Sequence, residues 1–483
     1  MKGARPASAG PTASAAEAIA KVSPARAAAF EILTLVGEGK GHSDELLHSA
    51  RTAALTLEDR NLATALVMGV LRWQIALDAR VGKLLARPEQ RLAEPVALAL
   101  RMGAFQLLHM DRIPAHAVLN ESVEMCRAAG QPYAAGMVNA VLRKLAAANP
   151  ASQPRETARA RRTVPLFESP AAFAERLGHP RWLVERWVAA YGREAALAIC
   201  EYGQREPVRG AMFAGEDEAD DGEVAAGLSG EAAPQMDDGS RLVAELAAAA
   251  MPAPTRGEGV PRVWDCCAAP GGKTLLLARR LNLSLKGEAR GTPEVDVLAT
   301  DVSAKRLARM AARLRRYAYA ERVRCEVADA SAVAEGGMEA KLDLTKFDLI
   351  LCDVPCSGTG TLARNPEIRH RLLLEDLARQ AARQRALLGG ALGRLAPGGR
   401  LVYSTCSLEP EENEQVVDAA AGAAGLRRLS VKPLIAGLAE GGILRQEMAA
   451  RLIGGALDDD GALRTLPGVH GCDGFFAAVL ERI

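Results

Sequence analysis

Two cysteines, Cys356 and Cys406, follow predicted strands at positions suited to a nucleophile. Cys356 lies in FDLILCDVPCSGTG, where an apolar run typical of a strand buried on both faces ends in Asp353 and Pro355. Cys406 lies in LVYSTCS, a second strand-like run that ends just before PEEN, a proline-plus-acid helix start. Ligands of open α/β sheets bind at the carboxyl ends of strands. Both thiols are therefore candidates for chemistry, and a nearby helix N-terminus would modestly favour a Cys406 thiolate.

Three aspartates end three successive predicted strands. Asp301 lies in ATDVS, Asp329 lies in VADA, and Asp353 lies at the corner described above. An acidic residue at the position of Asp301 accepts both hydroxyls of a ribose in nucleoside-binding α/β folds. The carboxylate of Asp329 is suited to an adenine amino group. Each aspartate alone is more often a helix cap or a turn residue, but the three together favour an adenosyl ligand.

The stretch VWDCCAAPGGKT predicts a strand, a turn of small residues and a helix start. Gly271 and Gly272 allow the backbone to approach a ligand at the helix N-terminus. The ending GGKT resembles a phosphate-binding Walker loop, but Cys267 stands where that motif requires a glycine. The dinucleotide pattern G-x-G-x-x-G is also absent. Both phosphate-binding motifs are therefore excluded.

Two kinds of periodicity divide the chain. From residue 260 onward, short apolar runs alternate with helical segments, which predicts a doubly wound, mostly parallel sheet. The predicted strands are 262–266, 295–300, 323–327, 347–352 and 400–404, and the predicted helices between them are 274–283, 304–319 and 375–395. Residues 23–147 show only helical spacing, with Ser23 before Pro24 and Thr56 with Asp59 as helix starts.

These patterns predict four regions. Residues 1–22 are expected to be a disordered leader, and 23–147 an all-helical domain. Residues 148–259 connect it to the α/β domain at 260–483. The connecting region contains the basic stretch RARRT, an amphipathic helix at 180–204 and an acidic stretch at 215–240 that we interpret as a solvated loop.

Composition narrows the class of protein. The 483 residues are 49% hydrophobic with a net charge of +1, so any nucleic-acid site must come from local basic clusters. The nine cysteines lack CxxC pairs, which argues against a disulfide framework and a zinc ribbon, and we expect no metal site. Neither a secretory h-region nor an uninterrupted apolar run of membrane-spanning length occurs. We therefore expect a cytoplasmic protein that does not enter a membrane.

Several motifs together resemble the NOL1/NOP2/Sun family of RNA cytosine-5 methyltransferases. They are DCCAAPGGKT, ATD, VADA, DVPCSGTG, RNPEIR, YSTCSLEPEENE and DGFFAAVL. In the helical region, GVLRW, RIPAHAVLNESVE and VNAVLRK resemble the NusB-like RNA-binding domain that marks the bacterial 16S ribosomal RNA branch of this family. The resemblance covers most of residues 23–205 and 260–483. It implies an all-α NusB-like domain followed by a Rossmann-like methyltransferase domain.

The same resemblance assigns roles to residues. It implies that the cofactor is S-adenosyl-L-methionine, at a site made of Cys267, Ala268, Ala269, Pro270, Gly271, Gly272, Lys273, Asp301, Asp329 and Asp353. Cys406 would be the nucleophile, and Cys356 would assist loss of the C5 proton and release of the product. These residue types suit the chemistry, because addition of a thiolate to C6 of cytosine makes C5 a nucleophilic enamine carbon. Asp353 would hydrogen-bond the N3 edge of the base.

The expected partner is 16S ribosomal RNA, in an unassembled or partly assembled small subunit, and the protein is expected to be a monomer. The reaction requires an unstacked base. We expect RNA-backbone contacts just beyond the DVPCSGTG corner, from Arg364, Asn365, Arg369, His370 and Arg371. Two alternatives stay open: the same chemistry on transfer RNA or another ribosomal cytosine, and a non-catalytic RNA-binding ribosome assembly factor. Between about 205 and 260 the sequence departs from the family pattern, with a shorter acidic loop in place of a strand-containing segment, so the resemblance does not carry over the family's RNA contacts from that segment.

Overall fold

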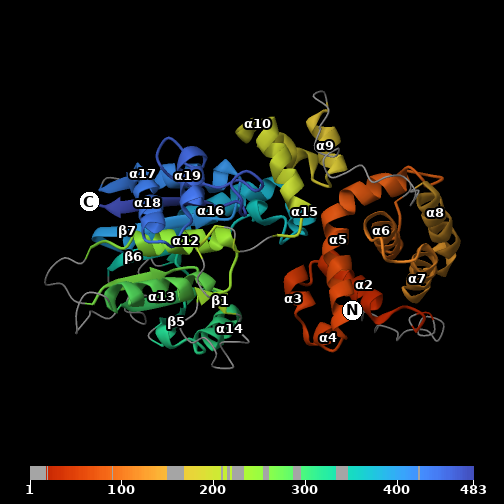
Figure 1. Ribbon diagram of the computed structural model, residues 1–483, viewed down its shortest axis with the longest axis horizontal. Coiled ribbons are helices and arrows are strands. Elements are labelled where there is room, and N and C mark those ends of the chain that lie inside the picture. The colour runs from red at the N-terminus through yellow and green to blue at the C-terminus, as the bar shows by residue number, and fades with distance from the viewer. Residues whose placement is uncertain are drawn as a thin grey trace, which may run out of the picture. The chain divides into compact units, whose positions relative to one another are not determined.

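The protein folds into two compact units in a computed structural model (Figure 1). One unit is Met1–Arg205 with Asn365–His370, and the other is Glu206–Arg364 with Arg371–Ile483. The structure describes residues 18, 20–89, 91–148, 168–207, 210, 212–214, 218–219, 233–253, 260–286, 295–321, 323–332, 346–422 and 425–483. The RARRT stretch and almost all of the predicted leader lie outside these residues, as does most of the acidic stretch 215–240.

The first unit is helical throughout its described residues, as the sequence predicts. Its elements are α2 (Pro24–Gly37), α3 (Ser43–Leu47), α4 (Ala50–Ala53), α5 (Leu57–Gly82), α6 (Glu94–His109), α7 (Ala115–Ala128), the 3-10 turn η1 (Pro132–Ala134), α8 (Ala135–Ala148), α9 (Pro170–Arg176) and α10 (Arg181–Gly203). Thr56 caps α5 by accepting from the backbone N–H of Asp59 at 3.1 Å, which confirms that predicted helix start.

The long helix α5 is the core helix of this unit. It packs against α2 and α6, and a Cβ on Gly69 would lie 1.9 Å from the ring of Phe105, so only glycine permits this approach. By length and hydropathy α5 qualifies as a membrane span. Half of the most apolar stretch of this helix is nevertheless buried inside the protein, as expected for a core helix of a folded domain.

The segment Asn365–His370 belongs to the helical unit although the chain on both sides of it belongs to the other unit. Arg369 is only 3% exposed and donates to the backbone carbonyls of Arg72 at 2.8 Å and Gly203 at 2.6 Å. His370 Nε2 lies 2.8 Å from the carbonyl oxygen of Leu71. The expectation that Arg369 and His370 contact an RNA backbone is therefore wrong, because both side chains are engaged with carbonyls inside this unit.

The second unit contains a mostly parallel sheet, as predicted. Its main strand order is β5-β4-β3-β6-β7-β10-β8, and the pairs from β5 to β7 are parallel. The strands are β3 (Arg262–Asp265), β4 (Asp296–Asp301), β5 (Val323–Val327), β6 (Phe347–Asp353), β7 (Leu395–Thr405), β8 (Leu426–Leu429), β9 (Leu463–Arg464) and β10 (Phe476–Arg482). The antiparallel pairing of β10 with β7, β8 and β9 was not predicted. A separate short pair joins β1 (Glu218–Ala219) to β2 (Ala233–Pro234).

Helices cover both faces of this sheet, which is the reason its strands are apolar runs. Val263 and Val402 pack into a core with helices α12, α13, α18 and α19, whereas the next residues, Trp264 and Leu401, face a second core beneath α16 and α17. The elements of this unit are α12 (Asp238–Ala249), α13 (Gly272–Lys286), α14 (Ala304–Leu314), η3 (Ala318–Ala320), η5 (Thr359–Thr361), α16 (Leu374–Gly393), η6 (Pro410–Glu412), α17 (Glu414–Ala421), α18 (Lys432–Glu440) and α19 (Gln446–Gly455). The short helix α15 (Ile368–Arg371) lies mostly within the segment that belongs to the helical unit. The predicted helix 304–319 is observed as the helix α14 followed by the separate 3-10 turn η3.

We expect Arg369→Leu to destabilise the helical unit. Loss of the guanidinium leaves several buried carbonyl groups without their donor, at a cost of about 2–5 kcal/mol in the free energy of unfolding. Urea denaturation followed by circular dichroism measures this. The matched control is Arg181→Leu in α10, because the Arg181 side chain is 71% exposed in an i,i+4 pair with Glu185, and such a change costs about 0.5 kcal/mol. Equal urea midpoints for the two variants would contradict the structural role of Arg369.

Candidate functional site

A cavity of about 220 Å³ opens at the carboxyl ends of β3 and β6. Strand β3 is the point where the sheet order reverses, with β4 on one side and β6 on the other. Ligands of doubly wound sheets bind at such a switch point. The cavity is lined by Gln235, Met236, Asp237, Ser240, Asp265, Cys267, Ala268, Ala269, Pro270, Gly271, Gly272, Lys273, Arg313 and Asp353.

Two residues of the cavity wall, Gly271 and Asp265, have unusual environments. Gly271 has a φ of +97°, and a Cβ there would meet the side chain of Met310 at 2.7 Å. Asp265 is 1% exposed, and its Oδ2 accepts from the Thr274 hydroxyl at 2.6 Å. Its other oxygen, Oδ1, has no hydrogen-bond partner. Burial raises the pKa of Asp265 to about 7, so this site holds a carboxyl group that lacks one partner.

Lys273 joins the cavity to the end of β6. Its ammonium lies 2.8 Å from Asp353 Oδ2 and donates to the hydroxyl of Ser240 at 3.0 Å. Burial works to lower the pKa of Lys273, but Asp353 outweighs it and the net pKa is raised. The second carboxylate oxygen of Asp353 accepts from Ser404 at 2.7 Å. Hydrogen bonds to Ser240 and Ser404 therefore orient both side chains of the ion pair.

The two predicted cysteines meet beside this ion pair. Cys356 Sγ lies 3.4 Å from Cys406 Sγ, although the residues are fifty positions apart in the chain. The contact with Cys406, followed by burial, raises the pKa of Cys356 well above its ordinary value. Charge on the Cys406 sulfur is the smallest of the contributions that raise the pKa of Lys273. The raised pKa of Cys356 means that this sulfur is held as a thiol.

Comparison with known proteins identifies the family. The sequence model described as 16S rRNA methyltransferase RsmB/F matches residues 252–481, and that of the NusB family matches 23–147. Ribosomal RNA small subunit methyltransferase B of Xanthomonas campestris pv. campestris is 33% identical over 430 residues, covering 84% of this chain and 89% of that protein. The chain belongs to the RsmB/F family of 16S rRNA methyltransferases. The protein of the same name from Salmonella arizonae is 30% identical over 456 residues, covering 88% of this chain and 90% of its own.

The fold of this RsmB/F member is also that of a solved structure. The crystal structure of PH0851 superimposes with a TM-score of 0.65 at 18% identity, covering 95% of this chain and 99% of that one. Together with the NusB match, this confirms the predicted NusB-like domain followed by a Rossmann-like methyltransferase domain.

The structure places the predicted cofactor residues in two groups. Residues 267–273 and Asp353 line the cavity. Asp301 and Asp329 are outside its lining but belong to the same sheet edge, on the neighbouring strand β4 and just after β5. Asp301 accepts from the backbone N–H of Ser303 at 2.8 Å, and exposed Asp329 accepts from Ser331. The binding roles of all these residues stay predictions.

Sequence reasoning missed the contribution of α12 to this RsmB/F site. Asp237 and Ser240 line the cavity, whereas we interpreted that stretch as the end of a solvated loop. Asp237 is the N-cap of α12 and accepts from the backbone N–H of Ser240 at 2.8 Å. The helix was detectable, because an acidic cap precedes apolar residues at helical spacing in RLVAELAAAA. Arg313 of α14, another lining residue, carried no comparable signal.

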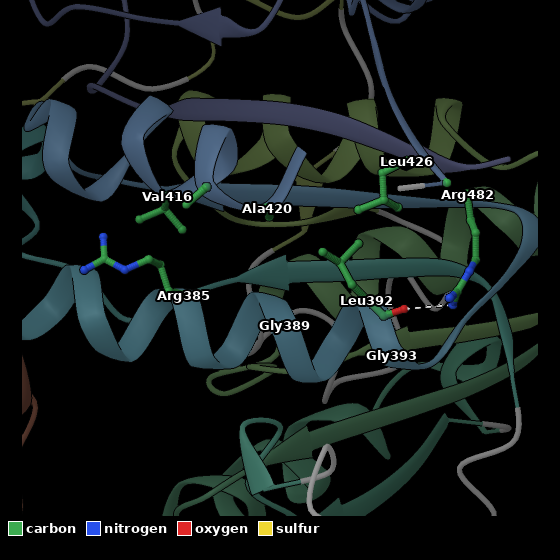
Figure 2. Close-up of a pocket in the computed structure, with 10 residues that line it drawn as sticks. Arg385, Gly389, Leu392, Gly393, Val416, Ala420, Leu426 and Arg482 are labelled. Carbon is green, nitrogen blue, oxygen red and sulfur yellow. Dashed lines mark hydrogen bonds between the residues drawn. The ribbon is translucent and has the colours of Figure 1, made fainter. Parts of the chain in front are cut away.

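A second, larger cavity of about 370 Å³ lies between α16, α17 and the end of β10 (Figure 2). Leu392, Val416 and Leu426 supply apolar walls, and Arg385 and Arg482 supply its charged groups. Arg482 donates to the carbonyl of Leu392 at 3.2 Å, as the dashed line in Figure 2 marks. None of the predicted site residues lines this cavity. The predicted cofactor residues that line a cavity therefore all line the smaller one.

We expect Asp265→Asn to remove a pH dependence from the stability. The folded-state pKa of Asp265 is raised to about 7 from 3.8, so between these pH values the folded state binds a proton that the unfolded state releases. Stability therefore falls as the pH rises through this window, by up to about 4 kcal/mol from this group. The asparagine variant keeps an acceptor for Thr274 and loses that slope. Urea midpoints at pH 5 and pH 8 measure it.

The matched control is Asp329→Asn, because Asp329 is exposed. From pH 5 to pH 8, Asp265→Asn should gain stability relative to the parent protein. The stability difference between Asp329→Asn and the parent protein should stay constant over the same range. A constant difference for Asp265→Asn would contradict the buried, protonated carboxyl.

Proposed function

We propose that this protein transfers a methyl group from S-adenosyl-L-methionine to C5 of a cytosine in 16S ribosomal RNA through a covalent bond between Cys406 and C6. The observation that carries this proposal is the 3.4 Å separation of the Cys356 and Cys406 sulfurs, in the turns that follow β6 and β7. Neither cysteine is among the residues that line the switch-point cavity, but Asp353 at the end of β6 is one of them. A single nucleophile would account for adduct formation. A second thiol at contact distance is suited to a reaction that must also release the product.

The cavity residues fit the cofactor. The unpartnered oxygen of Asp265 suits a ligand with polar groups, and residues 267–273 with Asp353 would hold it. Asp301 and Asp329, along the same edge, would bind its ribose and its adenine amino group. When bound, the cofactor supplies an electrophilic methyl group.

The protein's own residues account for the remaining chemistry. Cys406 would add to C6 of the cytosine through its sulfur, which turns C5 into a nucleophilic carbon. Asp353 at the cavity wall would hydrogen-bond the N3 edge of the base and stabilise the adduct. Cys356, in contact with Cys406, would assist loss of the C5 proton and departure of the Cys406 sulfur.

Ribosomal RNA is the substrate that the relatives' names support. The NusB-family match at residues 23–147 adds a second module to the catalytic unit, as expected of an enzyme that binds a large RNA. Transfer RNA or another ribosomal cytosine would use the same chemistry and remains the alternative substrate. The presence of both cysteines argues against a non-catalytic assembly factor.

We expect the two cysteine variants to fail in different ways. Cys406→Ala should bind the cofactor yet transfer no methyl group, because the carbon nucleophile at C5 is never generated. Cys356→Ala should accumulate a covalent RNA adduct, because its release is impaired. Denaturing gels of each variant with 16S ribosomal RNA and cofactor report both results, and Cys352→Ala, a buried cysteine in β6, is the matched control. Full activity of Cys406→Ala would reject the assignment.

We expect a single 5-methylcytosine in 16S ribosomal RNA to depend on this gene. Bisulfite sequencing of ribosomal and transfer RNA from cells with and without the protein locates the modified base. Loss of a 5-methylcytosine from transfer RNA alone would favour the alternative substrate. Complementation with Cys406→Ala should fail to restore the mark.

A further inference from the structure

Glu412 is a buried carboxylate between the two cysteine-bearing turns. It is 0% exposed and follows Cys406 by six residues, in the 3-10 turn η6. Its Oε1 accepts from the backbone N–H of Ser357 and from the side-chain amide of Gln384, both at 2.9 Å. Its Oε2 accepts from the hydroxyls of Ser357 and Ser407. Each of these two serines directly follows one of the paired cysteines in the chain.

The partners of Glu412 are neutral. In the described part of the chain no ion pair joins it to a lysine or arginine, so its charge is solvated by hydrogen bonds rather than neutralised. Leaving such a carboxylate buried is costly unless every lone pair finds a donor. Further bonds tie the same two turns together, including Gly360 N–H to the carbonyl of Cys406 and Leu408 N–H to Thr359, at 2.9 and 2.8 Å.

We propose that Glu412 is a positioning residue that holds the Cys356 and Cys406 turns in register and, through its buried charge, gives the two sulfurs different roles. This inference deepens the proposed function and rests on it only where methyl transfer is measured. The charge acts unequally, because Glu412 accepts from both the backbone N–H and the hydroxyl of Ser357, next to Cys356, but only from the hydroxyl of Ser407, next to Cys406. The contact with Cys406 and burial are the main causes that raise the pKa of Cys356, and the Glu412 charge adds to them. Cys356 is then the thiol and Cys406 the nucleophile.

Glu412→Gln separates charge from shape. A glutamine can keep its carbonyl oxygen toward Ser357 N–H and Gln384, while its NH₂ group donates to the hydroxyl oxygens of Ser357 and Ser407. The positions of the network's heavy atoms can thereby be retained, while the negative charge is lost and the two serine hydroxyls change from donors to acceptors toward residue 412. The matched control is Glu245→Gln in α12, a carboxylate that is also 0% exposed but is paired with Arg280, away from the cysteine turns.

The test is alkylation of the full-length free protein with iodoacetamide at pH 8, with each cysteine's rate followed by peptide mass spectrometry. In the parent protein we expect Cys406 to react faster than Cys356. Glu412→Gln should raise the rate of Cys356 relative to Cys406 by about tenfold, which corresponds to one pKa unit. Glu245→Gln should leave this ratio at the parent value. An unchanged ratio in Glu412→Gln, or faster labelling of Cys356 in the parent protein, overturns the proposal.

Ser357→Ala tests positioning independently, because it removes a hydroxyl that Glu412 binds but keeps the charge. We expect the labelling ratio to stay near the parent value and single-turnover methyl transfer, at saturating cofactor and RNA, to fall about tenfold. Full-rate transfer by Ser357→Ala overturns the positioning role. Failure of the proposed function is a separate result, seen as methyl transfer by Cys406→Ala, and the alkylation comparison does not depend on it.

Discussion

The parallel pairing of β6 with β7 determines where the two cysteine-bearing turns lie. In this register Asp353 is the partner of Ser404, so the turns that carry Cys356 and Cys406 leave the sheet side by side. A shift of one residue would turn the alternating side chains to the opposite faces and separate the pair. The apolar cores on both faces fix that register, because Ile350 and Leu401 pack in one core while Leu349 and Val402 pack in the other.

Several ionisable side chains line the same small cavity, where burial strengthens their electrostatic effect. Among them are Asp265, Lys273 and Asp353. The ion pair between Lys273 and Asp353 lies at the carboxyl end of β6. In such surroundings the effective dielectric is low and fixed charges act strongly on their neighbours. The same cavity holds the Asp265 carboxyl group, whose Oδ1 has no hydrogen-bond partner. Differences in environment of this kind underlie the different roles that we propose for the two cysteines.

In the segment Asn365–His370, the guanidinium group of Arg369 has a structural role. Guanidinium groups near a catalytic loop are often assigned to phosphate contacts, yet Arg369 is buried among backbone carbonyls and its pKa is lowered to about 9 by burial. Its role is to satisfy carbonyl groups where helices end, such as that of Gly203 at the end of α10. The chain therefore runs from the DVPCSGTG corner directly into the helical unit and back within a few residues.

Local sequence patterns were enough to predict the fold class, most strand positions and the turn at residues 267–273, because periodicity and turn chemistry depend on neighbouring residues. They also indicated that Cys356 and Cys406 follow strand ends. The folded chain was needed to show that these sulfurs are in contact, that α12 contributes to the cavity and that Arg369 is buried. Contacts between distant segments, such as Glu412 with Ser357, depend on strand order and burial, which local patterns do not encode. The antiparallel β10 was missed for the same reason, since nothing local specifies a strand's partner.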